Sequence, residues 1–295
     1  MNTISAKSIL SARKPGGWFG SDYTMNLYRG CCHGCIYCDS RSDCYGIEVF
    51  SEVQKKQDAL LILERELKTK RHKGLVLTGS MSDPYNPFEA AEQLTRGALA
   101  LLSRYAFGAI IITKSDLVVR DLELLRAIAT AAPVAVNFTI TTLDPVLCSK
   151  IEPYAPSAQA RLQAMAQLSR GGISCGVTLM PLLPFLNDTL EYLLPLVSRC
   201  AQTGAKWIYA QPGFPVSLRD RQRDYYYAQL DRLFPGLKQR YIQHFGDDYW
   251  CPSPNPALWP AFQAACKSNG LLWQHEEINA YIQRLAPAQQ ISLFH

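Results

Sequence analysis

The chain has 295 residues, a formal net charge of +5, 48% apolar residues and 19% charged residues. This length allows one large domain with an extended core, and the composition is that of an ordinary globular protein. The N-terminus has no apolar run of signal-peptide length, and the longest apolar stretch, 97–112, is too short to span a bilayer. We therefore expect a cytoplasmic protein with no membrane segment and with reduced cysteines. The mild positive charge permits a nucleic-acid partner without requiring one.

Apolar, β-branched runs alternate with helical patterns over roughly the first two thirds of the chain. The predicted strands are Thr24–Arg29, Gly74–Gly79, Gly108–Lys114, Val134–Thr142, Ser174–Leu182 and Lys206–Gln211. The predicted helices are Val53–Lys70, Phe88–Tyr105, Arg120–Ala131, Ala158–Arg170 and Thr189–Thr203. This alternation predicts an α/β fold with parallel strands, either a partial barrel or an open doubly wound sheet. A dinucleotide-binding fold is disfavoured because no Gly-x-Gly-x-x-Gly follows the first strand.

The pattern changes after Gln211, and we predict a mostly helical C-terminal extension, 216–295, packed on a core of residues 1–215. We expect residues 1–20 to form an N-terminal segment that leads into that core. Within the extension, the segment Arg219–Tyr227 is rich in Arg and Tyr. Such a segment could hold phosphates and stack bases, but its interspersed aspartates are equally typical of a salt-bridged surface helix.

Parallel βα architectures place their chemistry at the carboxyl ends of the strands. Several predicted strand ends carry polar residues, and the ends read in order CCHGCIYC, SMSDPYNP, KSD, TTLD, PLLP and QPGF. In the fourth strand, Asn137, Thr139 and Thr141 fall on one side, opposite apolar residues. A polar inner face predicts a lumen that holds a ligand, although threonine also favours strands in general.

Five of the ten cysteines lie between Asn26 and Cys44. Cys31, Cys35 and Cys38 have the spacing Cys-x3-Cys-x2-Cys. A zinc site could be completed by His33, Cys32 or Cys44. Thiolates in a tight loop also suit an iron–sulfur cluster, and three of them on a four-iron cluster leave one iron open for chemistry.

With an aromatic residue, Tyr37, before the third cysteine, the spacing resembles the signature of radical S-adenosylmethionine (SAM) enzymes. The segment YRGCCHGCIYC is similar to the branch that includes spore photoproduct lyase and its DNA-repair-photolyase-like relatives. The resemblance covers roughly residues 20–215, because GSMSDPYNPFE, IIITKSDLVVRD, ITTLD, IEPYAPS and MPLLPFLND recur in that order in the branch. It implies a partial (β/α)6 TIM-type barrel. It also implies a 4Fe–4S cluster at the barrel mouth, with SAM chelating the fourth iron.

The resemblance also assigns roles to individual residues. It implies that Cys31, Cys35 and Cys38 ligate iron and that Tyr37 lies beside the adenine. Two further residues match SAM-binding positions of the lyase, namely Ser82 and Lys114. We expect the lumen near the ribose or methionine moiety to be lined by Asn137, Thr139 and Thr141.

The sequence departs from the lyase at two places. Ser80 replaces the cysteine that donates a hydrogen atom, and Asp39 replaces the tyrosine that commonly follows the third cysteine. A hydroxyl cannot take over the thiol's role because its O–H bond is far harder to cleave homolytically. We therefore do not expect repair of the spore thymine dimer, and any protein hydrogen donor must come from other residues, of which the candidates are Cys44, Tyr85 and Cys251.

An auxiliary cluster is a further hypothesis, because four cysteines remain spare, namely Cys32, Cys44, Cys251 and Cys266. Cys148, Cys175 and Cys200 lie in or beside apolar elements and are expected in the core.

The resulting hypothesis is a radical SAM enzyme that forms a 5′-deoxyadenosyl radical and abstracts a hydrogen atom from a nucleic acid, a peptide or a small molecule. It would need a flavodoxin- or ferredoxin-type reductant. The alternatives are a zinc-stabilised nucleic-acid-binding protein without catalysis and an iron–sulfur electron carrier or sensor.

Overall fold

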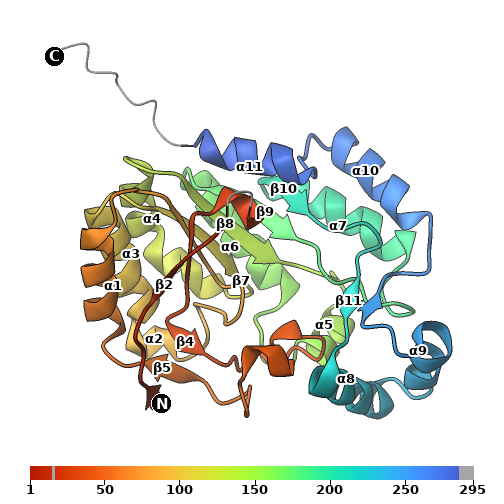
Figure 1. Cartoon of the computed structure of the whole chain (residues 1–295). Coiled ribbons are helices and arrows are strands. Elements are labelled where there is room, and N and C mark those ends of the chain that lie inside the picture. Colours follow the sequence, from red (N-terminus) through yellow and green to blue (C-terminus); the bar gives the residue numbers. More distant parts are fainter. Residues whose placement is uncertain (15–16, 286–295) are drawn as a thin grey trace.

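The computed structural model describes residues 1–14 and 17–285. Its centre is a seven-stranded sheet in the order β10-β9-β8-β7-β6-β3-β2 (Figure 1). Neighbouring strands from β10 to β3 are parallel, and β2 pairs with β3 in the antiparallel direction. In that order the strands are Ala205–Tyr209, Ser174–Thr178, Val134–Thr139, Gly108–Thr113, Leu75–Thr78, Tyr23–Met25 and Leu10–Ala12. The expected mixed α/β fold with a parallel sheet is confirmed.

One face of the sheet is covered by helices α3 (Leu94–Arg104), α4 (Leu122–Ala129), α6 (Ala158–Arg170) and α7 (Leu190–Gln202). Helix α1 (Ala59–Thr69) packs on α3 (Figure 1). Val136 and Phe138 of β8 belong to the hydrophobic cluster on this face, whereas Ala135 belongs to a separate cluster. The alternation predicted for this strand is therefore present, because successive side chains of a strand point to opposite faces.

The opposite face of the sheet is filled at its base by apolar side chains. Trp207 of β10 is fully buried there beside Ile278 of α11 (His275–Gln283) and Phe19 of η1 (Trp18–Gly20). A Cβ at position 176 would lie 2.0 Å from a ring carbon of Trp207, so only glycine leaves room for the indole at this strand position. The described residues of this face therefore form an apolar, buried base.

The predicted first strand, 24–29, is divided in the structure. The chain leaves the main sheet after Met25, and β4 (Tyr28–Arg29) joins a three-stranded sheet with β5 (Gln54–Lys56) and β1 (Asn2–Ile4). For the same reason the helix predicted over 53–70 begins only at Ala59, since the backbone of 54–56 pairs with the neighbouring strands.

The helix predicted over 88–105 is also divided, into α2 (Glu89–Glu92) and α3. Between them Gln93 has φ of 52°, outside the helical region. The buried carboxylate of Glu89 accepts hydrogen bonds from the N–H groups of Thr95 and Arg96, which begin the second helix. The helix predicted over 120–131 starts as the 3-10 helix η4 (Asp116–Asp121) and continues as α4. The prediction for 158–170 coincides with α6.

Three helices close to the strand ends come from short connecting segments. They are η2 (Asp39–Arg41) and η3 (Asp43–Tyr45) after the cysteines, and α5 (Pro145–Ile151) after β8. The sequence patterns did not predict α5. Its N-cap residue is Asp144, whose carboxylate accepts hydrogen bonds from the N–H groups of Val146 and Leu147.

The C-terminal part forms β11 (Val216–Ser217), α8 (Asp220–Leu233), α9 (Leu237–Phe245), β12 (Trp250–Cys251), α10 (Leu258–Ser268) and α11. Helix α10 packs on α7, and helix α11 packs on β10 and η1. Helices α8 and α9 pack on each other, and α8 lies beside η2 (Figure 1). The boundary at 215/216 stays a prediction. No helix among the described residues is long and apolar enough to cross a membrane.

Candidate functional site

The loop that carries the three cysteines is held from two sides. On one side the N–H of Cys31 donates to the carbonyl of Phe50 at 2.8 Å. On the other side, the N–H of Ile36 donates to the carbonyl of Ile151 at 3.0 Å, and the N–H of Tyr154 donates to the carbonyl of His33 at 3.1 Å. Glycine is required at 30, where φ is +79° and a Cβ would lie 2.6 Å from the carbonyl oxygen of Glu52.

The three thiols share one electrostatic neighbourhood. Burial is the main cause that raises the pKa of each thiol, to about 12 for Cys31. Ionised Cys38 raises the pKa of both Cys31 and Cys35 further, whereas the cation of Lys114 lowers that of Cys35 and Cys38. Thiolates in such a place need compensating positive charge, which bound iron supplies.

The three cysteines therefore fit a cluster of several iron atoms, in which each thiol would ligate a different iron. Within residues 1–14 and 17–285, no three His, Cys, Asp or Glu side chains are grouped as ligands of a single metal ion.

The Ser-Asp pair after β6 connects the cysteine loop to the end of β7. Asp83 is buried, and its carboxylate accepts hydrogen bonds from the Thr113 hydroxyl and the Lys114 N–H, each at 2.7 Å. His33 of the cysteine loop places Nε2 at 3.2 Å from the same carboxylate. Burial alone would raise the pKa of Asp83, but His33 and the hydrogen bonds outweigh it and lower the pKa to about 2. Asp83 is therefore ionised at neutral pH.

Ser82 lies against the loop. Its buried hydroxyl donates to the carbonyl of Gly30, the residue before the first cysteine. The structure thus gives this hydroxyl a partner in the protein, and its predicted contact with SAM stays a prediction.

A cavity of about 230 Å³ opens beside the third cysteine at the strand ends. Its inner wall includes Tyr37, Cys38, Lys114 and Thr139, four of the residues predicted for the site. A second group of lining residues, here called the outer wall, was not predicted from the sequence to bind a ligand; it consists of Trp18, Tyr45 and Ser217, together with Asp39 and Ser80.

Lys114 is the cation of this cavity. Its Nζ lies 5.5 Å from the centre of the Tyr37 ring. Burial opposes its charge, but Cys35, Glu152 and Cys38 outweigh that effect and raise the pKa of the ammonium group. A fixed positive charge at this place can bind a carboxylate.

A buried ion pair lies behind Tyr37. Glu152 and Arg161 are 2% and 1% exposed, and their charged groups approach to 2.5 Å. The phenol of Tyr37 donates a hydrogen bond to the Glu152 carboxylate. Neither charged residue was predicted from the sequence, although Glu152 lies in IEPYAPS, one of the segments that carry the resemblance.

The polar residues of β8 do not share one environment. Asn137 is fully buried under Trp207, where its amide donates to Thr178 and accepts from the indole N–H at 2.8 Å. Thr139 lines the cavity, whereas Thr141 is buried beyond the strand and does not line it. Ligand binding by Asn137 and Thr141 stays a prediction.

None of the three proposed hydrogen donors lines the cavity. Cys44 is exposed in η3, and Cys251 is fully buried beside the carbonyl of Asp248, at 3.4 Å. Tyr85 is buried and donates to the Asp121 carboxylate at 3.0 Å. Their roles in catalysis stay predictions, and the cavity itself offers Tyr45, whose hydroxyl donates to Asp39 at 2.9 Å.

The cysteines considered for a second cluster lie in different places. Cys251 and Cys266 belong to separate hydrophobic clusters, Cys32 is half-buried and Cys44 is exposed. Cys148, Cys175 and Cys200 are buried, as expected for core residues.

The arginines of the Arg/Tyr-rich segment are engaged within the protein. Arg221 Nε lies 2.6 Å from Asp43, and Arg223 donates to the carbonyls of Leu218, Asp247 and Asp248. The segment is therefore a salt-bridged helix that ties the C-terminal part to the loop after the cysteines.

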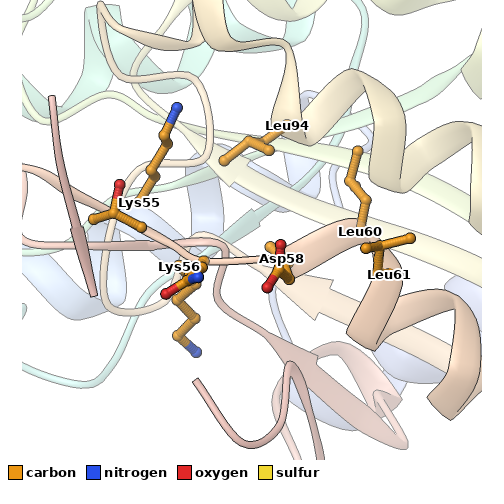
Figure 2. Close-up of a pocket in the computed structure, with 9 residues that line it drawn as sticks. Lys55, Lys56, Asp58, Leu60, Leu61 and Leu94 are labelled. Carbon is orange, nitrogen blue, oxygen red and sulfur yellow. The ribbon is translucent and has the colours of Figure 1, made fainter. Parts of the chain in front are cut away.

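A separate hollow of about 590 Å³ lies between β5 and α1 (Figure 2). Lys55, Lys56, Asp58 and three leucines are among the residues that line it. None of the residues predicted for the site contributes to it.

Comparison with known proteins identifies the family to which the chain belongs. The family model described as the radical SAM superfamily matches residues 25–194, more than half of the chain. The chain belongs to the radical SAM superfamily. Membership implies an enzyme, a 4Fe–4S cluster and SAM, and the cysteine loop described above fits that cluster.

Two relatives with similar sequences are themselves described as uncharacterised. One, from Mycobacterium tuberculosis, is 32% identical over 226 residues, which is 74% of this chain and 66% of the relative. The other, from Methanocaldococcus jannaschii, is 35% identical over 179 residues, which is 59% of this chain and 65% of the relative. The matched part thus spans slightly less than two thirds of each relative.

Solved structures of spore photoproduct lyase are similar in fold. A mutant with a dinucleoside spore photoproduct has a TM-score of 0.66 at 13% identity, covering 91% of this chain and 79% of the lyase. Another mutant, with bound AdoMet and the same photoproduct, has a TM-score of 0.65 at 13% identity and covers 92% and 82%.

Proposed function

We propose that this protein is a radical SAM enzyme that generates a 5′-deoxyadenosyl radical and uses it to abstract a hydrogen atom from a substrate bound at the strand ends. The observation that carries the proposal is the cavity in which Cys38, Tyr37 and Lys114 meet at the open end of a parallel sheet. Superfamily membership supports the same chemistry.

The residues present would have the following roles. Cys31, Cys35 and Cys38 would hold the cluster, Lys114 would bind the SAM carboxylate, and Tyr37 with Thr139 would enclose the nucleoside. A cluster held by these cysteines would supply the single electron, taken from an external reductant, that reductive cleavage of the C5′–S bond of SAM to methionine and a 5′-deoxyadenosyl radical requires. The buried inner wall excludes water from that bond.

A substrate would reach the cavity over its outer wall, past Trp18, Tyr45, Asp39 and Ser217. The similar lyase structures hold a dinucleoside photoproduct, so nucleic acid is the first substrate class to test, followed by peptides and small metabolites. The spore photoproduct itself is disfavoured, because Ser80 occupies the place of the hydrogen-donating cysteine. A flavodoxin- or ferredoxin-type protein is the proposed reductant.

The first experiment is anaerobic reconstitution with iron and sulfide, followed by dithionite and SAM, with 5′-deoxyadenosine as the product measured. Cys35→Ala should abolish the product, whereas Cys44→Ala, which removes an exposed thiol outside the loop, should retain cluster and product. Lys114→Ala should keep the cluster and weaken SAM binding by about tenfold or more, since it removes a charged partner.

The possible outcomes separate the alternatives. A brown protein that neither binds SAM nor forms 5′-deoxyadenosine would be an electron carrier or sensor. A colourless protein with stoichiometric zinc would refute the proposal. Unchanged SAM affinity in Lys114→Ala would refute the role given to that lysine.

A further inference from the structure

The ion pair between Glu152 and Arg161 is isolated from solvent, with 2% and 1% of the two residues exposed. The two residues come from different elements, since Glu152 follows α5 and Arg161 lies in the second turn of α6. Burial raises the pKa of Glu152, but Arg161, Lys114 and Tyr37 outweigh it and lower the pKa below the usual value. Both groups are therefore charged.

Stability alone does not explain such a pair. Removing two ions from water costs free energy that their attraction often fails to recover, and apolar residues of similar volume often serve as well or better. The neighbouring elements are otherwise packed by apolar residues, such as Ile151 and Leu162, which are fully buried. The charged pair must therefore be judged by what else it contacts.

Two of its contacts lead to residues that line the cavity. Glu152 accepts the hydrogen bond from the phenol of Tyr37, whose ring forms part of the inner wall. Arg161 donates to the carbonyl of Thr139, which also lines the cavity, at 2.9 Å and to that of Pro156 at 2.8 Å. The guanidinium thus joins the end of β8 to the segment that supports the cysteine loop.

We infer that Glu152 and Arg161 are positioning residues for the SAM-binding wall, acting through the Tyr37 phenol and the Thr139 carbonyl. The inference rests on the proposed function and concerns residues for which no role had been expected from the sequence. The hydrogen bond to the carboxylate fixes the orientation of the Tyr37 ring. It also restrains the backbone of the neighbouring residues, Ile36 and Cys38. The ring orientation and the third cysteine are therefore set together.

Tyr37→Phe tests the inference because it removes only the hydroxyl and leaves the ion pair in place. The matched control is Tyr226→Phe, which removes another buried phenol; this one donates to Tyr241 at 2.9 Å and does not line the cavity. Both variants should lower the unfolding temperature. Tyr37→Phe alone should raise the Kd for SAM, by about tenfold, the loss expected for one hydrogen bond to a charged group. It should also change the electron paramagnetic resonance spectrum of the reduced cluster with SAM.

A double-mutant cycle shows whether Glu152 acts through Tyr37. Glu152→Gln should raise the Kd for SAM in the wild-type background and change it by less than about twofold in Tyr37→Phe, because coupled sites are not additive. If Glu152→Gln does not fold, the pair Glu152→Leu with Arg161→Met removes both charges at once. That variant should fold and bind SAM about as weakly as Tyr37→Phe.

The results distinguish this inference from the proposed function. A wild-type protein that takes up no iron or does not bind SAM refutes the proposed function. A wild-type protein that does both, with Tyr37→Phe binding SAM as tightly as Tyr226→Phe, refutes only the inference. Independent effects of Glu152→Gln and Tyr37→Phe, or normal SAM binding by the apolar pair, would make Glu152 and Arg161 purely structural and would also overturn it.

Discussion

Replacement of Asp83 by asparagine tests whether one carboxylate holds the cysteine loop against the sheet. In the structure, one oxygen of Asp83 accepts from the Thr113 hydroxyl and the Tyr85 N–H, and the other from the Lys114 N–H beside His33. The Thr113 hydroxyl donates to Asp83, because an ionised carboxylate can only accept, and it also accepts from the N–H of Ser115. Both ends of the carboxylate therefore face donors.

The magnitude follows from this geometry. An asparagine has one oxygen, so its NH₂ group must face the backbone N–H of either Tyr85 or Lys114, which then has no acceptor. A buried unsatisfied donor costs about 1–3 kcal/mol, and loss of the charge weakens the remaining bonds by about 1–2 kcal/mol. We expect Asp83→Asn to lower the free energy of unfolding by about 2–5 kcal/mol, which overlaps the loss of about 3–5 kcal/mol in other buried pairs that lose one partner.

The assay is urea unfolding of the metal-free protein at neutral pH. Asp144→Asn is the matched control, because Asp144 caps α5 through Val146 and Leu147, and asparagine caps helices about as well, within about 0.5 kcal/mol. Iron content after reconstitution should fall in Asp83→Asn, since His33 loses its anion, and should not change in the control. A loss below about 1 kcal/mol, or equal losses in both variants, would refute this reasoning.

Two further predictions concern packing and thiol chemistry. Gly176→Ala should destabilise the protein by about 1–3 kcal/mol, because its Cβ would lie 2.0 Å from the Trp207 ring, and an unchanged unfolding midpoint would contradict the described packing. In the cluster-loaded protein at pH 8, an alkylating reagent should modify exposed Cys44 first. Burial raises the pKa of Cys175 and Cys200 to about 12, so both stay protonated and should react only on unfolding, which mass spectrometry of the labelled peptides can check.

Much of the architecture was predictable, because local signals and the fold agree. The β-branched runs at 108–113 and 134–139 became central strands, and α6 has the predicted bounds. The errors arose where distant residues compete for backbone groups. The break at Gln93 depends on Glu89 capturing the N–H groups of the next helix, which no local propensity shows.

The site was predictable from local sequence only in part. The cysteine spacing, Tyr37 and Lys114 could be recognised, and the structure brings them together at one cavity. The pairing of Glu152 with Arg161 could not, because each residue in isolation has the properties of a solvent-exposed helix residue. The interior position of Asn137 under Trp207 likewise depends on the glycine in the neighbouring strand, at 176.

The cavity combines two walls of different origin. The inner wall comes from the cysteine loop and the sheet, whereas the outer wall comes largely from short segments, namely Trp18, Asp39, Ser40, Tyr45 and residues 215–217. Under the proposed function, initiation of the reaction and choice of reactant are encoded by largely separate stretches of sequence. Diversifying Trp18, Tyr45 and Ser217 would then change selectivity and leave unchanged the residues proposed to start the radical reaction.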